Sequence, residues 1–566
     1  MALSIWLIAS TLLILRSAMA SPPHTTHHQP HSHSTISDGD RPAYMEFVVN
    51  ATHFPLQDNT FDYIIVGGGT AGCPLAATLS KNYRVLLLER GGVPFTNPNV
   101  MTREGFLSTL TAQQSFDSPA QPFVSEDGVP NARGRVLGGS SSINAGFYSR
   151  ADQDFYTRSG INWGGGSLIQ RAYEWVEKAI VFQPQLQTWQ SAVRDGLLEA
   201  GVEPFNGFTL NHTLGTKIGG STFNSSGHRH SAADLLNFAA NPSNIKVALY
   251  ATVHKVLFAP SYSLTSRKVA TGVVFHDLLG GYHHAMLRDH QNGEVILCAG
   301  AIGTPQLLLL SGIGPRPYLS SWGIPVVRHS PYVGNYMYDN PRNGISIVSP
   351  VPVEHSLIQV VGITNSGAFL EAASNVLPFS APAYSVFLRS STSPLYLTVA
   401  SIMEKIIGPH SYGTLRLAST DVRTNPLVRF NYFSHPVDLE RCVNGTRKIG
   451  DLLRSSSMDD FKFGEWSGTT NFRFVGPALP VNQSNNLLMA DFCRRTVSTI
   501  WHYHGGCVVG RVVDRDLKVV GVHSLRVVDG STFTVSPGTN PQATLLMLGR
   551  YMGMKILRER MHKSSV

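Results

Sequence analysis

Residues 61–90 read FDYIIVGGGTAGCPLAATLSKNYRVLLLER, and this stretch determines the fold of the chain. The apolar run from Tyr63 to Val66 predicts a buried strand, and the G-x-G-x-x-G pattern after it continues into helical spacing. A second apolar run, from Arg84 to Leu88, predicts another strand that ends at Glu89. Strand, helix and strand in this order predict a βαβ unit that binds a dinucleotide.

The three glycines of the pattern have separate roles. Gly67 permits a tight turn, Gly69 lets the backbone approach a pyrophosphate, and Gly72 lets helix and strand pack closely. The positive end of the helix would face the phosphates. Glu89 follows Gly69 by 20 residues (89 − 69 = 20), where an acid accepts the hydroxyls of an adenosine ribose. Such an acid favours FAD or NAD over NADP, and the motif alone does not choose between those two.

The size and charge of the chain narrow its class. It has 566 residues, too many for one core, which predicts at least two domains. Hydrophobic residues make up 42% and charged residues 14%, as in an ordinary globular protein. The net charge of +8 comes from basic residues scattered along the sequence, so it does not predict nucleic acid as a partner.

The first 20 residues have the features of a signal peptide. Ile5 to Leu15 form an apolar segment, and Ala18-Met-Ala20 fits a small-x-small cleavage site. A membrane anchor is the alternative, but the run is short for a bilayer, and no later stretch could span one. We therefore expect a secreted protein that carries N-glycans. The N-x-[ST] sequons lie at Asn50, Asn211, Asn224, Asn444 and Asn482.

Residues 21–58 are rich in Pro, His, Ser and Thr, and they predict a disordered polar leader. The histidines between His24 and His33 could bind a metal. No second cluster of ligands accompanies them, so we predict no metal site.

The chain has five cysteines. An oxidising compartment allows a disulfide, and an odd number leaves at least one thiol free. Sequence spacing alone does not identify the pair.

A second glycine-rich loop lies in residues 133–146, which read RGRVLGGSSSINAG. Gly138 and Gly139 precede three serines, so the backbone here can approach a ligand closely. The small residues could lie against a flat ring, and Asn144 could offer its amide to that ring.

The remaining segments suggest how two domains share the chain. Residues 245–300 alternate with the period of a strand and predict a β meander attached to the dinucleotide fold. A helix is predicted to begin near Thr304, and a long one to run from residue 540 to 557. Residues 155–225 mix helices with loops, and residues 340–490 alternate strand-like runs with helices. We assign both segments to a second domain that shapes the substrate pocket.

These motifs resemble the glucose-methanol-choline (GMC) oxidoreductases. The matching segments occur in the family's order: 67–72 with Glu89, 133–146, 300–315 and 502–540. The resemblance implies FAD rather than NAD. It implies an α/β, Rossmann-like FAD-binding domain and an α+β substrate domain with an antiparallel sheet. We place the FAD domain at residues 59–154, 226–339 and 491–566, and the substrate domain at 155–225 and 340–490.

Within the family, the C-terminal segments are similar to plant members. Residues 501–507 (WHYHGGC) and 548–553 (LGRYMG) resemble both the mandelonitrile lyases and the HOTHEAD-type proteins. Their disulfide pattern carries over to Cys442 and Cys493. Cys507 would then be a free thiol near the flavin.

The resemblance also assigns cofactor contacts. Val253 lies in a predicted strand, where packing in the core is the alternative role. The predicted FAD-binding residues, which include the three glycines of the motif, are Gly67, Gly69, Thr70, Ala71, Gly72, Glu89, Arg90, Val136, Ser140, Asn144, Ala145, Gly146, Phe147, Val253, Trp501, His502, Gly530, Asn540, Pro541 and Gln542.

Two residues are predicted to be catalytic. Oxidation of an alcohol removes its O–H proton and passes a hydride from carbon to flavin N5, and an imidazole is the natural base near neutral pH. His502 aligns with the family's catalytic histidine, whereas His504 is expected to be structural. The second catalytic position is His or Asn in this family, and here it is Asn540, whereas the cyanogenic lyases carry His. An amide cannot exchange a proton, so Asn540 favours an oxidoreductase over a lyase.

Three functions remain open at this point. The first is an FAD-dependent alcohol oxidoreductase with a small alcohol substrate and an electron acceptor such as O2. The HOTHEAD-type resemblance implies long-chain ω-hydroxy fatty acids as one substrate class. The second is a hydroxynitrile lyase whose FAD has no redox role, and the third is a non-catalytic flavoprotein.

Overall fold

The computed structural model describes residues 41–55, 59–111, 115, 117–260, 268–289, 292–379 and 395–564. The predicted signal peptide, residues 1–20, and the histidine-rich part of the predicted leader lie outside these ranges. Within the described ranges, no helix combines the length and the apolar character needed to cross a membrane.

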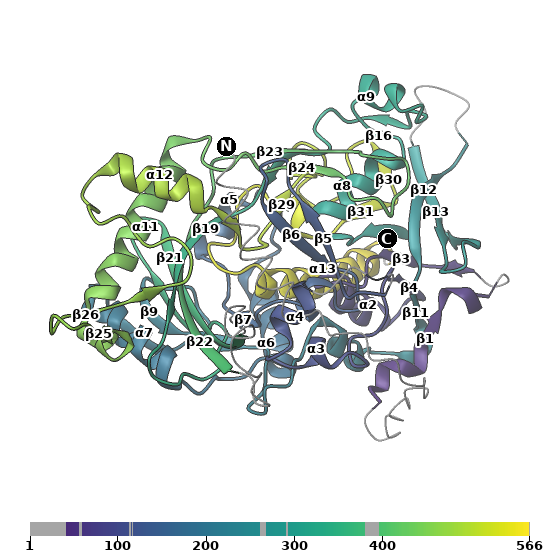
Figure 1. The fold of residues 1–566 in the computed structure, drawn as a ribbon. Helices are drawn as coiled ribbons and strands as arrows, with labels where there is room; N and C mark the ends of the chain where they lie inside the picture. Colours follow the sequence, from purple (N-terminus) through teal and green to yellow (C-terminus); the bar gives the residue numbers. More distant parts are fainter. Residues whose placement is uncertain are drawn as a thin grey trace, which may run out of the picture.

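A six-stranded parallel sheet forms the centre of the first domain (Figure 1). Every residue of β3 and β4 is buried, because helices and loops cover both faces of the sheet. Burial on both faces explains why these strands read as continuous apolar runs in the sequence. In spatial order the strands are β1 (Val48–Asn50), β11 (Ile245–Leu249), β4 (Val85–Leu88), β3 (Tyr63–Val66), β15 (Glu294–Leu297) and β31 (Leu525–Val527).

Two strands of this sheet differ from the sequence prediction. β1 lies inside the predicted leader, yet it pairs with β11, and the nearby Tyr44 and Phe54 are 1% and 4% exposed. The prediction of a disordered leader is therefore wrong for residues 41–55. β11 was expected in a meander, but it pairs in parallel with β4. The meander begins only at β12. This strand belongs to a separate sheet that also contains β13, β14, β2 and β30. These strands span Thr252–Phe258, Lys268–His276, Tyr282–Leu287, Thr60–Phe61 and Val522–His523.

Helices α2 (Gly72–Leu79), α6 (Gly166–Ile180), α8 (Gly300–Leu310) and α13 (Gln542–Ser564) surround the parallel sheet. α13 packs against both α2 and α6. Leu168, Tyr173 and Val176 of α6 belong to the same hydrophobic core as β3. The predicted domain boundary at residue 155 is therefore displaced, because α6 completes the core of the FAD domain.

The second domain contains a larger sheet that is antiparallel except where β8 runs parallel to β9. α7 (Thr188–Glu199), α11 (Pro436–Arg454) and α12 (Asn486–Thr496) lie in this half of the molecule (Figure 1). α12 packs on α11, so the predicted boundary at residue 490 falls inside a helix. The sheet order is β27 (Arg473–Phe474), β19 (Pro341–Val348), β22 (Leu395–Ile406), β21 (Ala368–Phe379), β20 (Val360–Ile363), β9 (Gly215–Ile218) and β8 (Phe205–Phe208), and β28 (Ser498–Thr499) also pairs with β19.

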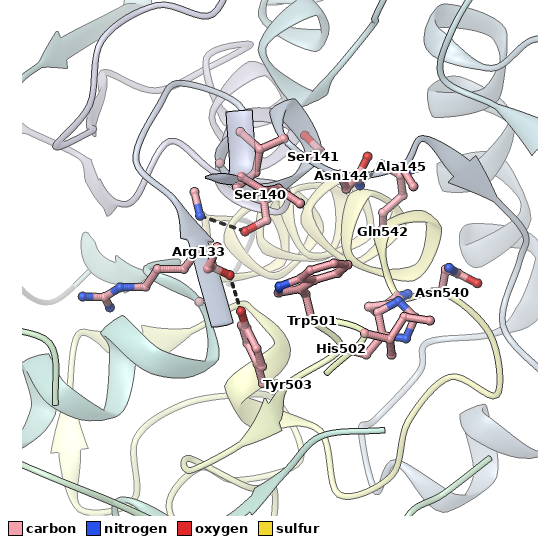
Figure 2. Close-up of a pocket in the computed structure, with 18 of the residues that line it drawn as sticks. Arg133, Ser140, Ser141, Asn144, Ala145, Trp501, His502, Tyr503, Asn540 and Gln542 are labelled. Atoms are coloured by element: carbon pink, nitrogen blue, oxygen red, sulfur yellow. Dashed lines mark hydrogen bonds between the residues drawn. The ribbon is translucent and has the colours of Figure 1, made fainter. Parts of the chain in front are cut away.

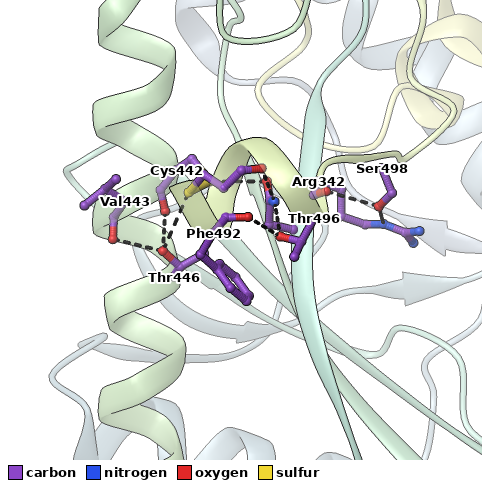
Figure 3. Close-up of a disulfide and its surroundings, with 9 residues drawn as sticks. Arg342, Cys442, Val443, Thr446, Phe492, Thr496 and Ser498 are labelled. Atoms are coloured by element: carbon purple, nitrogen blue, oxygen red, sulfur yellow. Dashed lines mark hydrogen bonds between the residues drawn. A yellow bond between two sulfur atoms is a disulfide. The ribbon is translucent and has the colours of Figure 1, made fainter. Parts of the chain in front are cut away.

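A disulfide links α11 to α12, between Cys442 and Cys493 (Figure 3). The pairing implied by the family resemblance is confirmed. Cys507 is a free, buried thiol, as are Cys73 and Cys298.

Shorter elements connect the two domains. A four-stranded sheet in the order β24 (Leu427–Arg429), β23 (Gly413–Arg416), β18 (Asn335–Tyr338) and β29 (His504–Gly505) carries the segment after His502. Two-stranded pairs are β5 (Ala120–Val124) with β6 (Pro130–Gly134), β7 (Phe147–Tyr148) with β10 (Gly220–Ser221), β16 (Ile313–Gly314) with β17 (Arg328–His329), and β25 (Phe463–Gly464) with β26 (Thr470–Asn471). The short helices are α3 (Pro98–Met101), α4 (Phe106–Thr111), α5 (Gln153–Arg158) and α9 (Arg316–Ser321).

Candidate active site

A cavity of about 1310 Å³ runs from the glycine motif after β3 to the face of the antiparallel sheet. Every predicted cofactor residue lines it except Gly72 and Val136. Gly72 has the packing role that the sequence predicted, because a Cβ there would lie 2.0 Å from the carbonyl oxygen of Gly67. Val136 was predicted to contact the cofactor but does not line the cavity. Its side chain is 2% exposed and belongs to a small core behind the loop.

The glycine motif forms an open cradle at one end of the cavity. Gly67 has φ +108, and a Cβ there would lie 2.4 Å from the carbonyl oxygen of Cys298, so only glycine fits. A Cβ on Gly69 would meet nothing nearer than the Cα of Gly139, at 3.8 Å. The space beside Gly69 is therefore free, and α2 begins next to it at Gly72. This arrangement fits a pyrophosphate at a helix N-terminus.

Glu89 provides an acceptor at the same end. One carboxylate oxygen accepts the N–H of Gly68 at 3.0 Å, and the other accepts that of Gly91 at 2.8 Å. Burial raises the pKa of Glu89, and the positive charge of Arg90 opposes this shift. A carboxylate has about four lone-pair directions, so acceptor capacity remains for ribose hydroxyls.

The loop after Gly139 is tied to the start of α13. The amide of Asn144 donates to Oε1 of Gln542 at 2.8 Å, and Gln542 donates to the carbonyl oxygen of Phe147 at 2.9 Å. Figure 2 shows Asn144 and Gln542 next to each other, with Trp501, His502 and Asn540 further along the cavity. These bonds join segments almost 400 residues apart, with a separation of 398 for Asn144 and Gln542. Neighbouring small residues leave room for a flat ring, so the donors and the shape of the cavity fit FAD.

The backbone at Trp501 is strained. Its φ is 60, a left-handed conformation that bulky residues rarely adopt. The N–H of Trp501 donates to Oγ1 of Thr499 at 2.7 Å, and the N–H of His502 donates to Oδ1 of Asp339 at 3.0 Å. Asp339 also accepts from the hydroxyls of Tyr432 and Thr499, at 2.5 and 2.7 Å. The strain therefore lies next to the predicted base and is held in place by one buried carboxylate.

His502 lines the cavity and is 9% exposed. Burial lowers the pKa of His502 well below its ordinary value, and the charge of Lys405 is the next largest cause. His504 and Arg342 add to this effect. The imidazole is therefore neutral over the physiological range and is able to accept a proton.

Asn540 lies beside His502 in the cavity (Figure 2). Nζ of Lys405 donates to Oδ1 of Asn540 at 2.7 Å. Lys405 is 2% exposed, and its nearest carboxylate is Glu371, at 3.9 Å.

Three charged residues near the cavity were not predicted from the sequence pattern: Lys405, Glu371 and Arg342. All three point from antiparallel strands toward the cavity side of the sheet, where Arg342 pairs with Lys405 across β19 and β22. A charged residue at an alternate position of a strand is usually exposed to solvent, which is why the pattern gave no indication of this cluster.

The predictions for His504 and Cys507, and the role of Tyr503, concern the segment after Trp501. The ring of His504 stacks on that of Tyr338, with 5.0 Å between centroids, and does not line the main cavity. The hydroxyl of Tyr503 donates to the carbonyl oxygen of Ala132. Both residues therefore have packing and hydrogen-bonding roles. Cys507 does not line the cavity, whereas Cys298 does.

Comparison with known proteins identifies the family. The model of the N-terminal part of the GMC oxidoreductases matches residues 61–342, and that of the C-terminal part matches residues 409–549. The chain belongs to the GMC oxidoreductase family. It is an FAD-dependent oxidoreductase of alcohols.

Relatives of this GMC oxidoreductase confirm the predicted plant branch. A protein of Arabidopsis thaliana named "(R)-mandelonitrile lyase-like" is 70% identical, with 92% of this chain and 94% of the relative covered. "(R)-mandelonitrile lyase 1" of Prunus serotina is 48% identical, with 94% and 92% covered. "Sinalpyl alcohol oxidase Nec3" of Nesocodon mauritianus is 49% identical, with 91% and 92% covered. Protein HOTHEAD of Arabidopsis thaliana is 48% identical, with 89% of each chain covered.

Solved structures confirm the fold. Formate oxidase of Aspergillus oryzae superposes with a TM-score of 0.71 at 21% identity, over 88% of this chain and 98% of the other. At this identity the similarity concerns the fold alone.

Proposed function

We propose that His502 and Asn540 together act on the hydroxyl of an alcohol substrate. When bound, FAD supplies the acceptor for the hydride that leaves the alcohol carbon. His502 accepts the O–H proton, and the side-chain NH2 of Asn540 donates a hydrogen bond to the same oxygen while negative charge develops on it. The alcohol loses one proton and one hydride and becomes a carbonyl compound.

One observation supports this assignment most directly: the cavity pairs a neutral histidine with an amide. Burial favours the neutral form of His502, which leaves a ring nitrogen free to accept a proton. Asn540 has no titratable group, so the pair cannot work as two exchanging acids and bases. Cleavage of a cyanohydrin needs an acid to protonate cyanide as well as a base for the hydroxyl.

The substrate side of the cavity suggests an alcohol with a sizeable substituent. Beyond His502 the antiparallel sheet presents small residues to the cavity, among them Gly344, Ser346, Ala373 and Ser401. Ser346 and Ser401 are hydrogen-bonded to each other at 2.7 Å, so their hydroxyls do not need a polar partner on the ligand. We propose aryl and allyl alcohols and long-chain ω-hydroxy fatty acids as the first substrates to examine, with O2 as the first acceptor.

Hydroxynitrile lyase activity is the second candidate. It is favoured by the names of two relatives, one 70% and one 48% identical to this chain. Asn540 argues against lyase activity, because the family resemblance implies histidine at this position in the lyases.

A set of four proteins separates these functions: the wild type, His502→Ala, Asn540→Ala and Asn540→His. Anaerobic flavin reduction should slow by roughly 10²–10⁴-fold in His502→Ala, the usual worth of a positioned base. It should slow on the order of 10²-fold in Asn540→Ala. Both variants should retain FAD, because most cofactor contacts lie in other segments. Rapid cleavage of mandelonitrile by the wild type, without flavin reduction by any alcohol, would establish the lyase instead.

We further propose that the protein is secreted and N-glycosylated. The Cys442–Cys493 disulfide suits an oxidising compartment. Among the sequons, Asn211 and Asn482 are exposed and are the best candidates for glycans.

A further inference from the structure

Lys405 is a buried cation that holds the predicted second catalytic residue. It lies on β22, 2% exposed, and its Nζ donates to Oδ1 of Asn540 at 2.7 Å. Lys405 itself does not line the cavity, whereas Asn540 does. The lysine therefore stands behind the amide and contacts the substrate region only through it, while its charge also lowers the pKa of His502.

The hydrogen bond determines which end of the amide faces the cavity. An ammonium group has three donors and no acceptor, so only the oxygen of Asn540 can face Lys405. The Nδ2 group has no hydrogen-bond partner among the described residues, and the side chain borders the cavity. The NH2 group is thus the end left for a ligand.

Two neighbours on β21 hold Lys405 in this position. A carboxylate oxygen of Glu371 lies 3.9 Å from Nζ, and the ring centroid of Phe369 lies 4.0 Å from it. Glu371 is 1% exposed, and neither of its oxygens has a hydrogen-bond partner among the described residues. A buried cation needs such compensation, because burial lowers the pKa of Lys405 to about 8 while the charge of Glu371 opposes the shift.

We propose that Lys405 is a positioning residue that locks Asn540 with its NH2 group toward the substrate oxygen. This inference rests on the proposed function, and it assigns part of that function to a residue outside the cavity. An amide that can rotate presents its oxygen as often as its NH2, and the oxygen would repel a developing alkoxide. Locking the amide therefore helps the transition state more than the bound alcohol, so kcat depends on it more than KM does.

A double-mutant cycle tests this role. Lys405→Met removes the donor and keeps the length of the side chain, and Asn540→Ala removes the amide. At pH 7.5, anaerobic flavin reduction should slow by roughly 10- to 100-fold in Lys405→Met, the range for a charge-assisted hydrogen bond. The double variant should be no slower than Asn540→Ala alone, within about threefold, because at this pH His502 is neutral with or without the lysine charge that lowers its pKa, and the remaining effect of the lysine passes through the amide. Independent, multiplying effects would overturn the proposal.

Other variants provide the controls. Lys405→Arg keeps a charged donor and should restore much of the rate. Lys217→Met is the matched control, because Lys217 is equally buried on β9 of the same sheet but bonds only to Ser149, Thr209 and Asn211, away from the cavity. It should lower stability and leave flavin reduction per bound FAD unchanged.

Asn540→Asp tests the orientation without altering Lys405. The carboxylate keeps an acceptor for the lysine but has no NH2 to offer and adds a negative charge beside the developing alkoxide, so this variant should be at least as slow as Asn540→Ala. A rate near that of the wild type would mean that the oxygen of residue 540 is the working group, and the proposal would be wrong.

The same four proteins can be compared by their affinity for an unreactive alcohol. This measurement tests the role of Lys405 even if no alcohol is oxidised. Trifluoroethanol is an alcohol that resists oxidation, and its affinity can be followed by the absorbance of bound FAD. Lys405→Met should weaken its binding in the wild-type background and not in the Asn540→Ala background. Failure of every alcohol to reduce the wild-type flavin would overturn the proposed function alone. Equal weakening in both backgrounds would overturn the role of Lys405.

Discussion

The buried carboxylate of Asp339 affects both the position of the His502 backbone and the pH dependence of stability. It accepts hydrogen bonds from the backbone of His502 and from the hydroxyls of Tyr432 and Thr499. Burial raises the pKa of Asp339 from 3.8 to about 7, and these hydrogen bonds oppose the shift without cancelling it. A raised pKa in the folded state means that the stability linked to this group is full below about pH 3.8 and declines as pH rises through about 7.

Asp339→Asn should therefore change both stability and its pH dependence. The amide offers one acceptor oxygen in place of two, so at least one donor loses its partner, at a cost of about 1–3 kcal/mol. The decline in Tm between about pH 4 and 7 should become shallower, because Asn does not titrate. Flavin reduction should slow while FAD remains bound, since the base loses the anchor of its backbone. Thermal unfolding at several pH values and anaerobic reduction measure these effects.

Thr499→Val is the matched control for Asp339. It removes a hydroxyl from the same cluster and adds or removes no titrating group. It should lower Tm and keep a decline of Tm with pH, which extends to slightly higher pH because one hydrogen bond that lowers the pKa of Asp339 is lost. If Asp339→Asn and wild type show the same pH dependence, the raised pKa of this carboxyl has no effect on folding.

The sequence predicted some residues well and others not at all, for physical reasons. Gly67, Glu89 and Gln542 lie in motifs whose backbone or charge requirements appear in the local sequence, and each of them lines the cavity. Lys405 and Asp339 act through partners that are far away in the chain, separated by 135 and 163 residues from Asn540 and His502. Local patterns carry no information about such pairings.

At the level of elements, the disulfide between α11 and α12 supports the wall of the substrate domain. Asn343 of β19 donates to the carbonyl oxygen of Cys493 at 2.8 Å and to Oγ1 of Thr496 at 2.7 Å. α12 ends at Thr496 and leads through β28 to Trp501. The bridge therefore fixes the helix from which the catalytic segment departs.

Replacing both Cys442 and Cys493 by Ser should lower stability. The two cysteines are 51 residues apart, and closing a loop of that length is worth about 4 kcal/mol in the chain-entropy model. Flavin reduction should stay within a few-fold of the wild-type rate at low temperature, because the bridge itself does not line the cavity. Cys507→Ala is the control: it removes a free buried thiol and leaves the bridge intact. An equal loss of Tm in both proteins would show that the bridge contributes no more than ordinary packing.

The strands also show which features of the fold the sequence pattern does not determine. β3, β4 and β15 are fully or almost fully buried and read as uninterrupted apolar runs, so their class was clear. β11 has the same alternation as its meander neighbours, yet it pairs with β4. Alternation identifies a strand and its buried face, but it does not identify the partner strand. β1 has only three residues, too few for a periodic signal, and the apolar residues around it directly follow the polar residues 21–40 with which they were grouped.

For the molecule as a whole, the segment from residue 41 to 55 belongs to the FAD domain. Its strand β1 forms the edge of the parallel sheet, paired with β11 in parallel register. Tyr44, Ala51 and Phe54 are 1%, 0% and 4% exposed and belong to the main hydrophobic core. Full burial of a large apolar side chain is worth roughly 1.5–3 kcal/mol, and the net stability of a domain is only about 5–15 kcal/mol. This short segment therefore contributes a large fraction of the stability of the domain.

Two truncated proteins test this conclusion. A chain that begins at Arg41 retains every contact described here, and it should bind FAD and unfold at the wild-type temperature. A chain that begins at Asn59 loses β1 and the three core residues, which exposes β11 as a new sheet edge. It should be poorly soluble or, where soluble, should melt at a markedly lower temperature and lose FAD on heating first. Thermal unfolding followed by flavin fluorescence compares the two proteins directly. If the chain from Asn59 melts at the same temperature as the chain from Arg41, the segment contributes nothing to the core, and the prediction of a disordered leader through residue 58 is right.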